Sequence, residues 1–185
     1  GMLQRITKFI EEQLKLKVNQ TKSGIRRPSE MQLLGYSFCQ DEEGYQLQIA
    51  PKSYERFKRK VKQLTNKRQP LSMNDRLKGL KALTIGWYNY FKLDKTRWKL
   101  ESLDRWIRRR LRCCIWYRWR RIRTRYRALV RLGAIRYNAA RWARTRKGGW
   151  RVSNSQILKM TITNARLKAE GYVSLTELYS KKLTA

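Results

Sequence analysis

The spacing of hydrophobic residues changes several times within the first fifty positions. Apolar residues recur every three or four positions over residues 3–14, which predicts an amphipathic helix. Residues 15–19 alternate between apolar and polar and predict a short strand. Apolar runs at 33–39 and 45–50 flank a turn-forming sequence at 41–44, which predicts a hairpin. The first fifty residues therefore predict a helix followed by short antiparallel strands.

Downstream of these strands the hydrophobic spacing is helical. Apolar stripes predict three successive helices, over residues 54–64, 73–91 and 96–114. Ser72 and Asp75, three residues apart, have the spacing of a cap at the start of the second helix. The three helices together predict a three-helix bundle.

Glycines and capping residues predict the limits of shorter helices. Gly133 predicts the end of one helix. The pair Gly148 and Gly149 predicts the end of a further basic helix that starts near Ile135. Ser174, with Glu177 three residues later, predicts a capped final helix.

The change of spacing divides the 185-residue chain near residue 50. Residues 1–50 predict a small α/β part, and residues 51–185 predict a mainly α-helical part. The predicted fold class is therefore α+β.

Positive charge is concentrated in the helical part. The chain has 45 Lys and Arg against 13 Asp and Glu, a formal charge of +32. Residues 105–169 hold 21 of these basic residues and no acidic residue, and ten arginines lie between positions 105 and 125. Such arginines repel one another unless a polyanion lies against them.

Phosphate is the polyanion that this composition favours. The arginine fork matches phosphate oxygens, and seven Trp and ten Tyr supply stacking surfaces for bases. The alternatives for a basic run are a solvated face, a nuclear-localisation cluster, a membrane-binding helix and a calmodulin-like target. Each of the last three normally occupies one short segment. We therefore expect a nucleic-acid-binding protein, and the shape of A-form helices favours structured RNA, although composition alone does not separate RNA from DNA.

Missing residue types narrow the chemistry. The chain has no His, the commonest general base and metal ligand. Cys39, Cys113 and Cys114 form no CxxC pair, and we expect them to be small buried apolar residues. The four aspartates are scattered, so we expect no metal site and no cofactor. No apolar run has the length of a membrane span, and we expect a soluble cytoplasmic protein without a membrane partner.

Five short segments occur in an order that resembles one protein family. The segments LKLKVNQTKS at 14–23 and LLGYSF at 33–38 resemble the end of the palm in group II intron reverse transcriptases. The segments GWYNYF at 86–91, DRWIRRRLR at 104–112 and ARTRKGGWR at 143–151 resemble the maturase-specific domain, the thumb of the same proteins. One such motif is weak, but the five in order extend over most of the chain.

The resemblance implies the C-terminal part of a bacterial intron-encoded protein that is both reverse transcriptase and maturase. Such a thumb binds group II intron RNA to assist splicing and holds the RNA/DNA template–primer duplex. The catalytic aspartate pair of these enzymes lies upstream of the helix predicted at 3–14 and is absent here. We therefore expect no catalysis by this chain alone, and Mg²⁺ only for the full-length polymerase. No oligomeric state is predicted.

The resemblance and the charge pattern select candidate site residues. Lys22 resembles a palm lysine near the triphosphate, with a solvated turn lysine as the alternative. Leu34, Gly35 and Tyr36 resemble the grip on the primer end, with plain strand packing as the alternative. The candidate RNA-binding residues are twelve basic residues of the helical part: Arg105, Arg108, Arg109, Arg112, Arg118, Arg120, Arg121, Arg141, Arg144, Arg146, Lys147 and Arg151.

Three other functions stay open at this point. A ribosomal or other constitutive structured-RNA-binding protein is disfavoured by the seven Trp. A stand-alone enzyme is disfavoured by the missing His and carboxylate cluster. The third alternative is a decayed intron remnant that folds but has no activity.

Overall fold

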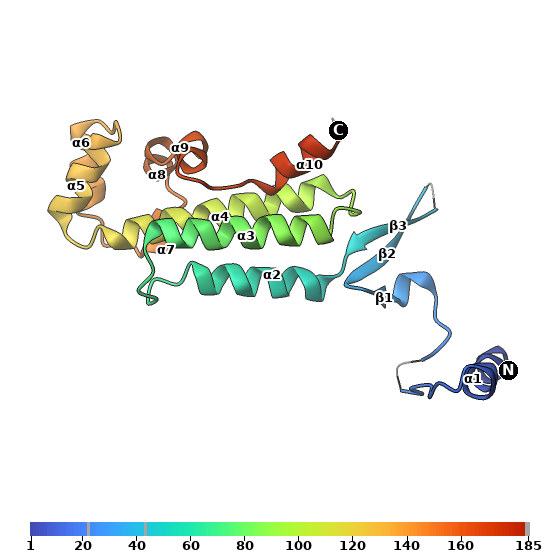
Figure 1. Cartoon of the computed structure of the whole chain (residues 1–185). Helices are drawn as coiled ribbons and strands as arrows, with labels where there is room; N and C mark the ends of the chain where they lie inside the picture. Colours follow the sequence, from blue (N-terminus) through green and yellow to red (C-terminus); the bar gives the residue numbers. More distant parts are fainter. Residues whose placement is uncertain (22, 43, 184–185) are drawn as a thin grey trace. The chain divides into compact units, whose positions relative to one another are not determined.

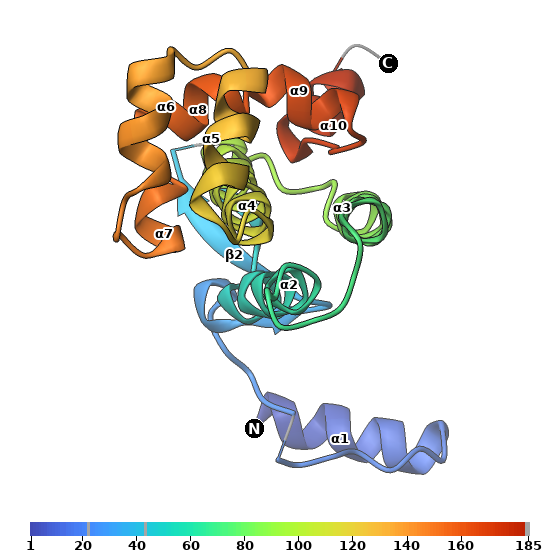
Figure 2. The ribbon, with the colours of Figure 1, turned by 90° about the vertical axis from the view of Figure 1, so that its left-hand side faces the viewer.

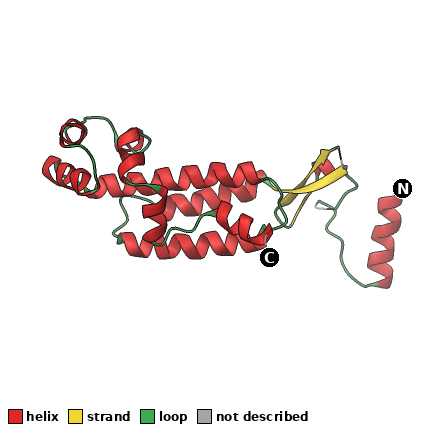
Figure 3. Ribbon diagram, turned by 90° about the horizontal axis from the view of Figure 1, so that it is seen from above, coloured by secondary structure: helices red, strands yellow, loops and turns green. Residues whose placement is uncertain are grey.

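The computed structural model describes residues 1–21, 23–42 and 44–183, and for Leu183 the backbone alone. It divides into two compact units, Gly1–Ala50 and Pro51–Ala185. The described residues are 62% helical, and their strands form one small antiparallel sheet in the first unit (Figures 1 and 3). The predicted α+β class is confirmed.

The first unit combines one helix with a three-stranded antiparallel sheet of order β1-β2-β3. Its elements are α1 (Met2–Gln13), the 3-10 helix η1 (Pro28–Glu30), β1 (Gln32–Leu33), β2 (Tyr36–Asp41) and β3 (Gly44–Ile49). Asp41 pairs with Gly44 across the β2–β3 hairpin, and Tyr36 pairs with Ile49 at its other end. The helix and the hairpin predicted for this unit are both confirmed.

The strand predicted over residues 15–19 is wrong. Lys15 has a φ of 51°, which turns the chain back after α1. The Leu16 N–H then donates to the Ile10 carbonyl at 3.3 Å, and the Val18 N–H donates to the Glu11 carboxylate at 3.3 Å. Because these two N–H groups donate to acceptors in α1, the segment is bonded to α1 and does not pair with another strand.

A tight turn divides the apolar run at 33–39 into two strands. Leu33 pairs with Tyr36, so Leu34 and Gly35 form a two-residue loop between β1 and β2. Both have positive φ, 51° and 81°. Positive φ at both central residues is the mark of a type I′ turn, whose twist matches that of the flanking strands.

The second unit is helical. Its elements are α2 (Pro51–Leu64), α3 (Met73–Tyr90), α4 (Arg97–Arg118), α5 (Ile122–Arg131), α6 (Arg136–Ala143), α7 (Gly149–Val152), α8 (Gln156–Thr161), α9 (Asn164–Ala169) and α10 (Leu175–Leu183). The three long helices α2, α3 and α4 lie side by side and are seen nearly end-on in Figure 2.

The predicted bundle of three helices has a closed apolar core. Phe57 and Val61 of α2, Leu80 of α3, and Leu103 and Ile107 of α4 are each at most 1% exposed and belong to one hydrophobic cluster. Burial of such side chains stabilises the fold by roughly 1.5–3 kcal/mol each. The Ser72 hydroxyl accepts from the Asp75 N–H at 3.1 Å, so the predicted cap of α3 is confirmed.

The glycine pair at 148–149 has a different role from the predicted one. α5 is followed by Gly133 with a φ of 92°, as predicted, but α6 already ends at Ala143. Gly148 and Gly149 instead begin α7, with Gly148 at the N-cap position. A Cβ on Gly149 would lie 2.7 Å from the ring of Tyr117. Close approach to α4 therefore requires glycine at position 149.

A buried carboxylate of α4 holds the start of α10. Asp104 is fully buried, and its Oδ1 accepts from the Tyr172 hydroxyl at 2.6 Å and from the Leu175 N–H at 3.0 Å. Its Oδ2 accepts from the Ser174 hydroxyl at 2.6 Å, and from the Thr176 N–H at 2.9 Å and hydroxyl at 2.8 Å. Burial and the Asp104 charge raise the pKa of Tyr172, which keeps its phenol a donor.

The predicted final helix exists, but its capping partner differs. The predicted acidic partner, Glu177, forms an ion pair with Lys168 of α9. The N–H groups at the start of α10 are satisfied instead by Asp104, far away in the sequence.

The three cysteines differ in environment. Cys114 is buried and its thiol donates to the Thr65 carbonyl at 3.1 Å, whereas Cys113 is half-buried. Burial raises the pKa of Cys113 to about 11 and also raises the pKa of Cys114. Cys39, in β2, is exposed, so the expectation that all three are buried is wrong.

Candidate nucleic-acid interface

Two of the arginines on α4 are used to hold the fold. Arg112 is 7% exposed, and its guanidinium donates to the Ile162 carbonyl at 2.9 Å and to the Asn164 side-chain oxygen at 3.0 Å. The Arg110 Nε donates to the Thr65 hydroxyl at 2.6 Å, which ties α4 to the end of α2. These hydrogen bonds attach α4 to the α8–α9 connection and to the end of α2.

Arg109 is fixed by an aromatic side chain. Its guanidinium lies 3.9 Å from the centroid of the Trp150 ring and donates to the Trp150 carbonyl at 3.0 Å. The same side chain keeps its buried Nε without an acceptor among the described residues. Arg109 is therefore positioned, yet it retains an unused donor.

The side chains beside these arginines form a basic hollow of about 410 Å³, here named the α4–α9 hollow. Both views of the ribbon place α8 and α9 next to α4 (Figures 1 and 2). The lining residues come from α4 and from the segment after α7: Arg105, Arg108, Arg109, Arg112, Asn154, Lys159, Thr163 and Asn164. Five cations and no carboxylate line it.

Two of the arginines in this hollow lie close enough for the charge of one to affect the ionisation of the other. Burial lowers the pKa of Arg112, and the charge of Arg108 lowers it further. The second contribution arises because the two guanidinium charges repel each other. An anion in the hollow would relieve that repulsion.

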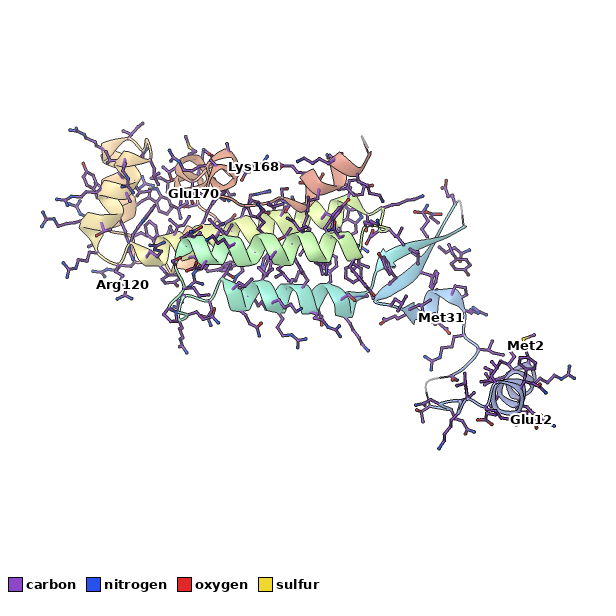
Figure 4. All side chains as sticks on the ribbon, in the orientation of Figure 1. Met2, Glu12, Met31, Arg120, Lys168 and Glu170 are labelled. Atoms are coloured by element: carbon purple, nitrogen blue, oxygen red, sulfur yellow. The ribbon has the colours of Figure 1, made fainter. Side chains whose placement is uncertain are left out.

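A second basic hollow, of about 330 Å³, lies on another part of α4. Arg118 and Arg120 line it together with Tyr117 and Lys67, whose ammonium lies 4.3 Å from the centroid of the Tyr117 ring. Arg76 also lines it but is 5% exposed, and it donates to the carbonyl of Leu64 at the end of α2 and to that of Gln69 in the α2–α3 connection. Figure 4 shows Arg120 projecting outward after the end of α4.

The remaining candidate residues lie on α5, α6, α7 and their connections, and all are exposed: Arg121, Arg141, Arg144, Arg146, Lys147 and Arg151. Arg141 lines a third hollow of about 460 Å³ that includes Trp142. The Lys147 ammonium lies 5.6 Å from the centroid of the Trp142 ring. The twelve predicted residues are thus distributed over several groups instead of one pocket.

The residues that resemble palm motifs lie in the first unit. Leu34 and Gly35 form the β1–β2 turn, and Leu34 is 73% exposed. Tyr36 is buried in β2. Lys22 lies outside the described residues.

Sequence reasoning missed the far wall of the α4–α9 hollow. Asn154, Lys159, Thr163 and Asn164 belong to short helices and turns with no recognisable motif. The one signal that includes them is the long segment without acidic residues, which extends to residue 169.

Neither a metal cluster nor a membrane-spanning helix is found in the part of the chain that the structure describes. Within that part no three Cys, Asp or Glu side chains are close enough together to hold a metal ion. No helix among the described residues combines the length and hydrophobicity required to cross a bilayer.

Residues 54–133 match the model of the group II intron maturase-specific domain. The match begins in α2, includes the whole of α4 and ends after α5. No curated protein matches the chain.

Proposed function

We propose that this chain is the RNA-binding part of a group II intron maturase, which binds intron RNA and assists its splicing. The observation that carries the proposal is the match of residues 54–133 to the maturase-specific domain, together with its overlap with the arginine-rich helix α4. A maturase domain has an RNA ligand, and the basic hollows beside α4 supply cations without competing carboxylates.

In a longer protein the same helices would hold an RNA/DNA template–primer duplex, and the first unit would be the end of a polymerase palm. The resemblance of residues 14–23 and 33–38 to palm segments supports this part of the proposal.

The test is a titration of the chain with a candidate intron RNA, an unrelated structured RNA and a DNA duplex, each at several salt concentrations. For a duplex the logarithm of the binding constant falls by about 0.9 per phosphate contact for each tenfold increase in salt, which separates phosphate contacts from other contacts. We expect the intron RNA to keep an advantage of at least about tenfold at moderate salt.

Two results would change the proposal. Equal affinity for both RNAs, with weaker binding of DNA, would favour a constitutive structured-RNA-binding protein. Equal affinity for all three, with release at the same salt concentration, would leave an electrostatic contact and no maturase specificity.

A further inference from the structure

We propose that the α4–α9 hollow is a binding site for one backbone phosphate of the RNA, contacted by Arg105, Arg108, Lys159 and the Asn164 amide. The inference rests on the proposed function, since it supposes RNA as the ligand. It adds two contact residues outside the family match, Lys159 and Asn164. It also makes Arg112 a positioning residue.

The far wall of the hollow is oriented by Arg112. The Asn164 side-chain oxygen accepts from the Arg112 guanidinium at 3.0 Å, so the NH₂ group of Asn164 remains to donate to a ligand. Arg112 also donates to the Ile162 carbonyl, which attaches the α8–α9 connection to α4. The hollow therefore presents a donor that is fixed before any ligand arrives, and fixed donors lower the entropy cost of binding.

The hollow combines a fixed cation with exposed ones. Arg109 is fixed on Trp150, while Arg105 is exposed on α4 and Lys159 is exposed on α8. The Thr163 hydroxyl accepts from the Arg166 N–H at 3.2 Å, which leaves its proton free to donate. Every side chain on this surface can thus offer a donor, the complement of a phosphate with its acceptor oxygens.

The charge count favours a phosphate within a strand over a small free anion. Five cations line the hollow, and one phosphodiester carries a single negative charge. The neighbouring phosphates of the same strand would neutralise the cations at the rim. The site is complete only when the segment after α7 folds against α4, because Asn164 and Lys159 belong to α9 and α8.

The decisive variant is Asn164→Asp. A carboxylate at this position keeps an acceptor for Arg112 and gains an ion pair with it, but it places negative charge in the hollow. We expect the affinity for an RNA hairpin to fall about tenfold or more while the thermal midpoint stays equal or rises. Asn89→Asp is the matched control, because Asn89 is exposed on α3 and lines none of the three hollows.

Two double variants each remove two positive charges from exposed positions. Arg105→Gln with Lys159→Gln should lower the affinity by about tenfold or more. Arg123→Gln with Arg127→Gln removes the same charge from exposed positions of α5 outside the hollow and should lower it by roughly threefold or less. Equal losses from both pairs would overturn the proposal.

A scan of the RNA identifies the ligand as a backbone phosphate. Neutral methylphosphonate groups are placed one at a time along the hairpin. We expect one position to weaken binding to the unaltered protein and to have little effect on the Asn164→Asp protein. If no position in the RNA were sensitive, and inorganic phosphate bound in the hollow instead, the hollow would be a site for a free anion. That result would overturn the proposal.

The design separates the two proposals. If the protein binds RNA with intron preference but Asn164→Asp binds as well as Asn89→Asp, the hollow is not the phosphate site and the maturase function stands. The other outcome is that the unaltered protein binds intron RNA and unrelated RNA equally well, while one methylphosphonate position and the Asn164→Asp substitution still weaken binding. The phosphate site would then stand, and the maturase specificity would fail.

Discussion

Arg105 and Arg112 lie two helical turns apart on α4, yet their surroundings differ. Arg105 is exposed at the rim of the α4–α9 hollow, whereas Arg112 is buried and bonded to Ile162 and Asn164. Loss of the Arg112 guanidinium leaves a buried carbonyl without a donor, which costs about 1–3 kcal/mol. We expect Arg112→Gln to lower the free energy of unfolding by that amount, measured by urea denaturation.

Arg105→Gln is the comparison for that measurement. An exposed side chain without buried partners should change the free energy of unfolding by less than about 0.5 kcal/mol. Equal stability of the two variants would mean that the Arg112 hydrogen bonds contribute nothing net.

The adjacent glycines 148 and 149 offer a matched pair. A Cβ at Gly149 would lie 2.7 Å and 2.8 Å from two ring atoms of Tyr117, so the ring or α7 must shift. We expect Gly149→Ala to destabilise the protein by about 1–3 kcal/mol, measured as a lower thermal midpoint.

Gly148 has open space around its would-be Cβ and a φ of −58°. Gly148→Ala should therefore be neutral or slightly stabilising, since alanine restricts the unfolded chain. If both alanine variants melt like the unaltered protein, the contact between α7 and Tyr117 is not tight in solution.

The thiols should react in order of exposure. Burial raises the pKa of Cys113 to about 11, so at pH 8 only about one thousandth of it is thiolate, the reactive form. We expect iodoacetamide at pH 8 to modify Cys39 first and Cys113 and Cys114 slowly, read by mass spectrometry of peptides. Fast labelling of Cys113 at pH 8 would contradict its burial.

The pH dependence of stability has a definite sign for Cys113. Its unfolded thiol ionises near pH 9 and its folded thiol near pH 11, so the folded state binds more protons between these values. Stability should therefore fall as the pH rises from 9 to 11. Cys113→Ser should reduce this part of the slope.

Among the elements, α10 depends on one carboxylate in another helix. Asp104 accepts five hydrogen bonds from the segment at the start of α10. Asp104→Asn replaces one acceptor oxygen by a donor and leaves buried donors unpaired. We expect a loss of about 3 kcal/mol or more and faster amide exchange over α10 than over α2. Glu177→Gln, at an exposed ion pair, should cost less than about 1 kcal/mol.

Helices whose apolar spacing continues over several turns could be predicted from the sequence. α2, α3 and α4 each repeat apolar residues on one face over several turns, and their packing follows from that face. The strand predicted at 15–19 could not be excluded from the sequence, because apolar and polar residues do alternate there. Whether such a segment forms a strand depends on its hydrogen-bond partners, and here those partners are in α1. The role of the 148–149 glycines depends on Tyr117, some thirty residues earlier, and local rules for helix ends contain no such information.

At the scale of the whole chain, the sequence predicted that the basic residues gather in the helical part but not which of them face a ligand. Arg105 and Arg112 lie seven residues apart in one segment without acidic residues, so the sequence does not distinguish their roles. Only the packing of α8 and α9 against α4 shows that Arg112 is held by the fold. The same long-range packing brings Lys159 to the hollow. Candidate residues on one helix were predictable, whereas those supplied by a second segment were not.

Charge is divided very unequally between the two units. Residues 1–50 hold seven Lys and Arg against six Asp and Glu, so 38 basic and seven acidic residues remain for residues 51–185. Phosphate contacts release counterions in proportion to their number, so the salt dependence of RNA binding should come from the second unit. We expect a protein of residues 51–185 to keep the slope of log affinity against log salt to within about one phosphate contact of the full chain.

A peptide of residues 1–50 serves as the comparison, since its formal charge is near neutral. It should bind RNA too weakly to give a measurable slope at 150 mM salt, roughly physiological ionic strength. If truncation to 51–185 instead lowered the slope by several phosphate contacts, the first unit would have to contact the backbone through its few cations. Uncompensated charge alone would then be an insufficient guide to the RNA-binding surface.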